Sequence, residues 1–160
     1  MQTGLRFIFI LSMGLWIGSI FFFAFIAAPG IFKVLPRETA GNVVSEIFPK
    51  YYMIAYVFGT LALLSALLMR FYGFRHGTLH VLTVIFLVIM LGLAVFAGNV
   101  IRPQAVETRA QMRSVGENAP EYREMQRKFS ALHTNSAMAN GAILILGIAI
   151  LFINAYTIRE

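Results

Sequence analysis

Hydrophobic residues form four long runs along the chain, separated by shorter and more polar stretches. The runs cover about residues 7–28, 51–69, 79–101 and 135–154. Each is long enough to cross a hydrocarbon layer of ~30 Å as a helix, which takes roughly 20 residues. None alternates with a period of two, as a membrane β-strand does. We therefore predict an all-α membrane protein, a single transmembrane domain over residues 1–160 that folds as a four-transmembrane-helix bundle.

The connections between the runs also have helical patterns. Four spans place both termini and the turn at 70–78 on one side of the membrane, here called side A. The connections 29–50 and 102–131 then lie on the other side, side B. Apolar spacing predicts a short amphipathic interfacial helix at about 36–48 that stops at Pro49. It also predicts a helical hairpin at about 103–132.

Inside this hairpin, turn chemistry sets the expected boundaries. Gly116 is expected to end the first arm as a left-handed cap, and Asn118 with Glu121 resembles a capping box at the start of the second. No helix breaker follows before Gly141, so the second arm should continue into the fourth span. The apolar side of that arm is expected to pack on Val106 and Ala110.

Composition supports a membrane location. Only 12% of the residues are charged and 59% are hydrophobic, whereas a soluble domain carries about 25% charged residues. The net charge of +6 is typical of basic residues gathered at span ends near anionic lipid, so no nucleic-acid partner is expected. We expect a multi-pass protein of the cell or inner membrane. Lys and Arg are more numerous on side B, which favours a cytoplasmic location for loops 29–50 and 102–131.

A polar stripe crosses the start of the fourth span. Phe129, His133, Ser136 and Asn140 follow one another at spacings of 4, 3 and 4, which places them on one helical face. Polar side chains entering hydrocarbon are costly unless they face protein, ligand or water. The stripe therefore marks an interior face.

Topology brings other polar residues to the same level on side B. Two interpretations remain open: the residues are hydrogen-bonded between helices, or they line a pocket for a ligand or ion. Trp16, deep in the first span, is either a core residue or one wall of that pocket. The candidate ligand-binding residues are His133, Ser136, Asn140, Asn99, Arg102, Tyr52, Tyr56 and Trp16.

Metal, haem and enzyme chemistry find little support. His76 and His80 lie on side A and His133 on side B, about 20 residues or ~30 Å of helix apart, so they cannot share one metal or haem. The absence of cysteine excludes disulfides and thiolate metal sites. A haem b held by His133 alone stays possible in principle, but no cofactor is required. We expect no metal site and identify no catalytic residues, so enzymatic activity is not predicted.

Two features bear on partners besides the lipid bilayer. Gly14 and Gly18 form a small-xxx-small pair in the first span, which allows another helix to approach closely. That helix belongs either to the same bundle or to a second copy in a homo-oligomer. The helical hairpin is the candidate surface for a partner protein.

Several stretches together resemble a known family. They are Leu15-Trp16-Ile17-Gly18, the stretch from Leu35-Pro36-Arg37 to Phe48-Pro49-Lys50-Tyr51-Tyr52, Asn99 with Arg102-Pro103, and Leu132-His133 with Ser136 and Asn140. In this order they resemble the transmembrane protein 205-like family, a four-span membrane domain of unknown function. The resemblance covers almost the whole chain. It implies a four-span fold and, less directly, a role in resistance to metal-containing drugs by export or sequestration.

The leading functional hypothesis is binding or transport of a small molecule or ion through a polar pocket at one membrane face. One alternative is a structural or accessory subunit that docks a partner protein. Another is a haem- or quinone-binding redox protein that uses His133.

Overall fold

The computed structural model describes residues 1–74, 77–116 and 119–157, and every regular element in these ranges is helical. Two elements, η1 and η2, are short π-helical segments inside longer helices. The predicted roles of His76 and Asn118 fall outside the described residues. The elements are α1 (Gln2–Phe22), η1 (Phe23–Ala27), α2 (Ala28–Val34), α3 (Arg37–Phe71), α4 (Thr78–Phe96), η2 (Ala97–Ile101), α5 (Arg102–Val115) and α6 (Pro120–Thr157).

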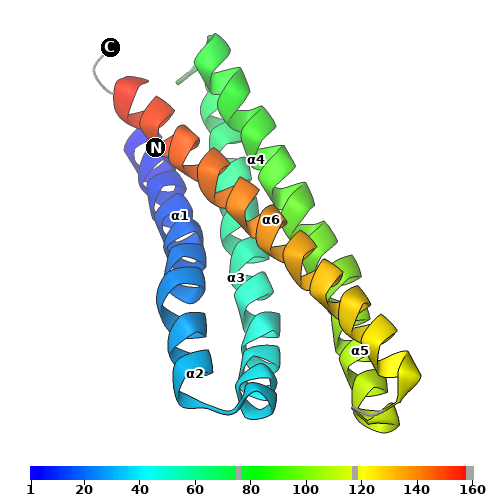
Figure 1. Cartoon of the computed structure of the whole chain (residues 1–160). Coiled ribbons are helices and arrows are strands. Elements are labelled where there is room, and N and C mark those ends of the chain that lie inside the picture. Colours follow the sequence, from blue (N-terminus) through cyan, green and yellow to red (C-terminus); the bar gives the residue numbers. More distant parts are fainter. Residues whose placement is uncertain (75–76, 117–118, 158–160) are drawn as a thin grey trace.

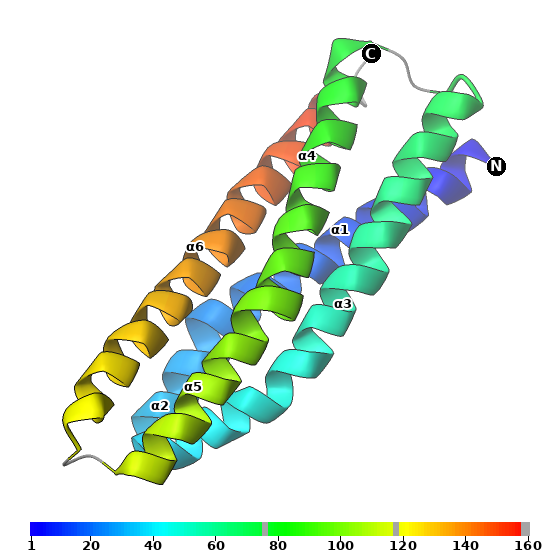
Figure 2. The same cartoon turned by 90° about the vertical axis from the view of Figure 1, so that its right-hand side faces the viewer.

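Four continuous helices are long and apolar enough to cross a membrane, which confirms the predicted multi-pass all-α fold. They run Gln2–Val34, Arg37–Phe71, Thr78–Val115 and Pro120–Thr157. The start of α1, the end of α3, the start of α4 and the end of α6 lie at one end of the bundle (Figure 1, Figure 2). At the other end lie α2, the start of α3, the end of α5 and the start of α6. These ends correspond to sides A and B.

The order of packing leaves α3 and α6 facing each other across the bundle. Helix α1 packs against α3 and α6, and α4 also packs against α3 and α6. Close approach depends on small residues: a Cβ at Gly59 would lie 2.9 Å from Trp16 Cζ3, and one at Gly147 would lie 2.6 Å from Ile17 Cδ1. The largest fully buried side chains belong to Trp16, Phe9, Met13, Met69, Leu87, Met90, Ile143 and Ile150.

The expected helix end at Pro49 is wrong, because α3 is one helix with Pro49 inside it. Membrane helices tolerate proline where neighbouring helices hold the chain in place. Here the flanking rings supply that support: Phe48 lies 5.5 Å from Phe23 and Tyr51 lies 5.4 Å from Phe23, measured between ring centroids. The amphipathic segment 37–48 is thus the first part of α3.

The helical hairpin is confirmed, but the residues of α5 that are buried are not the ones that were predicted to be. Gly116 ends α5 as expected and has a positive φ of 74°, which glycine adopts readily, but its ψ of 160° lies outside the left-handed helical region of the predicted cap. Thr108 of α5 is fully buried and Ala105 is half-buried, whereas Val106 is 47% exposed and Ala110 is exposed. The π-helical segment η2 precedes α5 and widens one turn, so it changes the direction in which the later side chains point.

Gly14 and Gly18 face away from the bundle, so the first of the two alternatives for this pair, packing within the same bundle, is wrong. Both are exposed, and a Cβ added at either would meet nothing within 4 Å. The inner face of α1 carries larger buried residues instead, among them Met13, Trp16 and Ile17.

Candidate functional site

Two tyrosines of α3 reach across the bundle to the polar stripe of α6. Tyr51 Oη donates a 2.8 Å hydrogen bond to Asn140 Oδ1. Tyr52 Oη lies 3.4 Å from Ser136 Oγ, and Asn140 Nδ2 donates a 3.1 Å bond to Ser136 O. A tyrosine side chain is long enough to bridge two helices that face each other diagonally. The polar stripe therefore has its partners on α3.

Gly98, in η2, allows α4 to approach these tyrosines. It is buried, and a Cβ at this position would overlap Tyr56 Oη and lie 3.0 Å from the Tyr52 ring. Its neighbour Asn99 accepts a 3.4 Å hydrogen bond from Tyr56 Oη through Oδ1. Because Gly98 has no side chain, the phenol groups of Tyr52 and Tyr56 can occupy the space beside it.

Aromatic rings form a continuous row through this end of the bundle. Phe23 of η1 contacts Phe48 and Tyr51, Phe48 stacks on Tyr52 at 6.0 Å, and Tyr52 stacks on Tyr56 at 6.4 Å. Ring pairs at these centroid separations add to the stability gained by burial. The row therefore holds the three phenol hydroxyls in fixed positions between α3, α4 and α6.

Arg102 completes the cluster as its cation. It is half-buried at the start of α5, and its charge lies within electrostatic range of the Tyr52 and Tyr56 phenols. Its Nε atom is buried and has no hydrogen-bond partner among the described residues. Here "the polar cluster" means Tyr51, Tyr52, Tyr56, Asn99, Arg102, Ser136 and Asn140.

Two of the predicted site residues lie apart from the polar cluster. His133 is exposed, and no contact of its side chain with the cluster is described. Trp16 is fully buried against Gly59, and its Nε1 has no hydrogen-bond partner among the described residues. Sequence reasoning had left out Tyr51, although it makes the shortest bond. Its position beside Tyr52 at the start of the span was the available signal.

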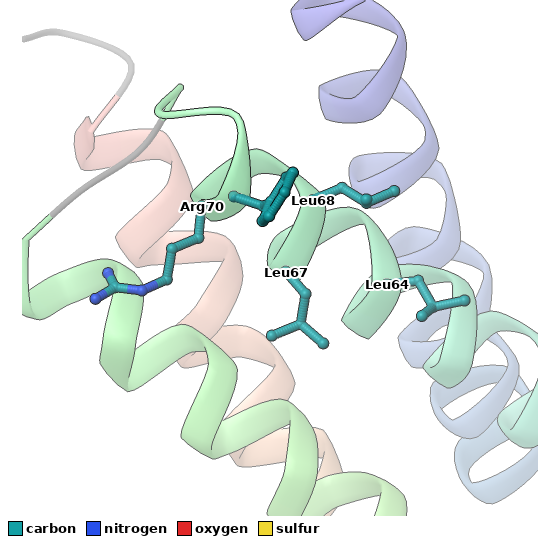
Figure 3. Close-up of a pocket in the computed structure, with 5 residues that line it drawn as sticks. Leu64, Leu67, Leu68 and Arg70 are labelled. Carbon is teal, nitrogen blue, oxygen red and sulfur yellow. The ribbon is translucent and has the colours of Figure 1, made fainter.

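Two surface hollows lie elsewhere. One, of about 550 Å³, lies beside the side A end of α3 and is lined by Leu64, Leu67, Leu68, Arg70 and Phe71. In Figure 3 the Arg70 side chain extends away from Leu64 and Leu68. The other, of about 430 Å³, is lined by Arg123, Gln126, Arg127 and Ser130 on the projecting part of α6.

A second set of polar residues is buried near side A and was not predicted. Helices α4 and α6 are antiparallel, and Met90 of α4 lies beside Gly147 of α6. Thr83 lies seven residues from Met90 toward side A, and Asn154 lies seven residues from Gly147 in the same direction, so these two polar residues share one level. His80 Nε2 lies 3.1 Å from Ala66 O, which brings α3 to nearly the same level. Every membrane helix contributes a buried polar residue to this layer, which lies toward side A from the Trp16–Gly59 and Met90–Gly147 contacts and consists of Ser12, Ser65, His80, Thr83 and Asn154.

Outside the apolar spans, Arg109 joins the hairpin to the first part of α3. Its guanidinium donates to Glu38 O at 2.8 Å and to Ser45 Oγ at 3.3 Å. It lies directly over Gly41, where a Cβ would overlap it. Burial and the nearby charge of Arg113 lower the pKa of Arg109 from its ordinary value, yet a guanidinium stays protonated in proteins.

Metal-ligating residues do not cluster in the part of the chain that the structure describes: no group of three or more His, Cys, Asp or Glu side chains comes together there. The polar cluster itself offers phenol, hydroxyl, amide and guanidinium groups. These groups bind polar molecules and anions through hydrogen bonds.

Comparison with known proteins gives a family and no activity. A segment of 43 residues is 51% identical to an uncharacterized protein of Aquifex aeolicus (strain VF5); it covers 27% of this chain and 31% of that protein. No solved structure matches the chain. Residues 11–114, from α1 to the end of α5, match the family described as Domain of unknown function (DUF4149). This range holds the α3, η2 and α5 residues of the polar cluster, and the chain belongs to that family.

Proposed function

We propose that the protein binds a small polar molecule or ion at the polar cluster and moves it through or out of the membrane. The supporting observation is the geometry of two hydroxyl groups. Tyr52 Oη and Tyr56 Oη make contacts of 3.4 Å, whereas O–H···O hydrogen bonds are normally 2.5–3.0 Å long. Both hydroxyls are held in place by their rings but weakly bonded, which leaves them available to a ligand.

A purely structural role predicts different geometry. Side chains that only lock helices together are expected to make short and well-aligned bonds, as Tyr51 and Asn140 do. The half-buried Arg102, with an unbonded Nε, adds charge at the cluster without adding a helix-locking bond. These two features favour a binding site that shares residues with an interhelical bond.

The side A layer supports movement across the membrane. Buried polar residues near both ends of one bundle, with Met13, Trp16, Leu87 and Met90 between them, provide two polar stations separated by an apolar barrier. Polar groups inside membrane bundles commonly mark substrate or ion pathways. Transport by a four-span chain fits an oligomer, and the exposed Gly14 and Gly18 offer a close-packing face for a second copy.

The finer family assignment is part of the same proposal. The two stretches that most resemble the transmembrane protein 205-like family meet in the bundle, since Tyr51 and Tyr52 of one contact Asn140 and Ser136 of the other. Export of a small molecule agrees with the role suggested for that family. A cytoplasmic side B is likewise proposed, from the excess of Lys and Arg there.

The proposal is tested by mass spectrometry of small molecules that co-purify with the protein in mild detergent. We expect a defined compound with wild type and its loss with Asn140→Leu. Arg127→Gln, on the projecting part of α6, is the control and should retain the compound. A wild-type protein that carries no bound compound, and transports none after reconstitution into vesicles, would contradict the proposal.

An accessory role is a second candidate, favoured by the length of α6. This helix has 38 residues, of which about 20 suffice to cross the membrane, so we expect its first part to extend beyond the membrane on side B. Figure 2 shows this part of α6 beside α5, at the same end of the bundle as α2. The basic hollow at Arg123 and Arg127 lies on this projection. Photo-cross-linking in whole cells from benzoyl-phenylalanine in place of Gln126 tests the accessory role. The absence of any specific cross-linked protein would be the negative result.

A further inference from the structure

Arg102 provides a cation that the protein itself does not neutralise. Among the residues that the structure describes, ion pairing is confined to Arg113 and Glu38, at the far end of α5 from Arg102. Among the described residues the Arg102 Nε is buried without a hydrogen-bond partner, and the Tyr52 and Tyr56 phenols lie within electrostatic range of the guanidinium. A partly buried guanidinium with neutral neighbours is most stable when an anion joins it.

The depth of Arg102 matches the headgroup region of the bilayer. The third apolar span ends at Ile101, and Arg102 is the next residue. Oxyanions of lipids and other amphiphiles are concentrated at this depth, where basic residues attract them. The Tyr52 and Tyr56 hydroxyls lie within electrostatic range of the guanidinium and are additional donors. Charge-assisted hydrogen bonds to a guanidinium favour carboxylate or phosphate.

An apolar track leads from Arg102 toward the membrane centre. Val88, Gly92 and Val95 follow one another at spacings of 4 and 3 on one face of α4, and all three are exposed, as is Asn99 in η2 just before Arg102. A Cβ at Gly92 would meet nothing within 4 Å, so the track is open at that point. This arrangement places an apolar strip below a polar, cationic head, as an amphiphilic ligand requires.

We propose that the polar cluster binds the oxyanion headgroup of an amphiphile, with Arg102 contacting the oxyanion and the tail lying along Val95 and Val88. This inference rests on the proposed function and names the ligand class of the same site. It differs from general attraction of basic residues to lipid, because it assigns the binding to Arg102 and not to the more exposed arginines of α6.

The test uses native mass spectrometry of the purified full-length protein in detergent, titrated with phosphatidylglycerol. We expect Arg102→Gln to weaken the first binding event about tenfold, the loss expected for a charge-assisted bond. Arg127→Gln removes the same charge from the α6 hollow and should leave that affinity within about twofold of wild type. Arg102→Lys keeps the charge and should retain part of the binding, which separates loss of the cation from loss of folding.

Two further probes define the ligand class. Phosphatidylcholine, which has no net charge, should bind wild type more weakly than phosphatidylglycerol, and equimolar inorganic phosphate should not displace phosphatidylglycerol. Equal binding by wild type and Arg102→Gln, equal binding of the two lipids, or displacement by phosphate would each overturn the inference. If Arg102→Gln has no effect while Asn140→Leu still removes a co-purified compound, the ligand class is wrong and the proposed function stands.

Discussion

Tyr51 on α3 and Asn140 on α6 are joined by a 2.8 Å hydrogen bond across the diagonal of the bundle. These two helices make few direct backbone contacts with each other, because α1 and α4 each pack between them. The bond therefore fixes the separation of two helices that other contacts position only indirectly. It also fixes the orientation of the Asn140 amide, whose Nδ2 donates to Ser136 O.

Breaking the bond between Tyr51 and Asn140 should lower the free energy of unfolding by more than breaking a longer and exposed hydrogen bond does. In a double-mutant cycle of Tyr51→Phe and Asn140→Ala, we expect a coupling energy of about 0.5–2 kcal/mol, the range found for hydrogen bonds inside membrane bundles. The measurement is the free energy of unfolding in mixed micelles. The matched cycle of Tyr56→Phe and Asn99→Ala should give a smaller coupling, because that contact is 3.4 Å long and exposed. Equal couplings would contradict this account.

Gly98 should be the glycine of the third span that tolerates a methyl group least. Gly98→Ala forces the Tyr52 and Tyr56 rings to move, and overpacking of this kind costs about 1–3 kcal/mol. Gly92→Ala, on the same span but in open space, should be neutral or stabilising, since alanine favours helix by about 1 kcal/mol. Thermal unfolding of the two variants compares them directly. A melting temperature of Gly98→Ala at or above that of Gly92→Ala would show that the rings do not lie on Gly98.

The sequence predicted the four spans and the level of the polar cluster because hydrophobic run length and helical spacing determine both. It could not predict that Tyr51, rather than Tyr52, makes the short bond to α6, since this depends on how far the bundle rotates α3. The outward direction of Gly14 and Gly18 depends equally on that packing. The side A layer was missed because single Ser and Thr residues in apolar runs give no sequence signal until antiparallel pairing brings them to one level.

Arg109 should control the order of the first part of α3. It bonds the Glu38 carbonyl and the Ser45 hydroxyl, so Arg109→Gln removes two charge-assisted contacts to residues 37–45. We expect amide hydrogen exchange of this segment to become about tenfold faster. Arg113→Gln removes the exposed contacts of Arg113 with Glu38 and Asn42, both in the same segment, and should change the exchange less than Arg109→Gln does. No change for Arg109→Gln would show that the hairpin does not hold this segment.

The orientation of the protein in the membrane can be measured by cysteine labelling, because the chain has no cysteine of its own that would react. Single cysteines at Gln104 and Ser130 report side B, and one at Tyr156 reports side A. With side B in the cytoplasm, a membrane-impermeant maleimide added to intact cells should label Tyr156→Cys only. Labelling of Gln104→Cys and Ser130→Cys before lysis, with Tyr156→Cys protected, would reverse the proposed orientation.

The central claim is that the polar cluster binds a ligand and does not merely join helices, and Tyr52→Phe tests it most directly. The Tyr52 hydroxyl contributes little to the fold through a 3.4 Å contact, so this variant should unfold within about 0.5 kcal/mol of wild type. The measurement is the amount of compound that co-purifies with wild type and with Tyr52→Phe, each quantified by mass spectrometry per mole of folded protein. We predict near wild-type stability with a severalfold loss of bound compound; unchanged bound compound together with a clear loss of stability would contradict the claim.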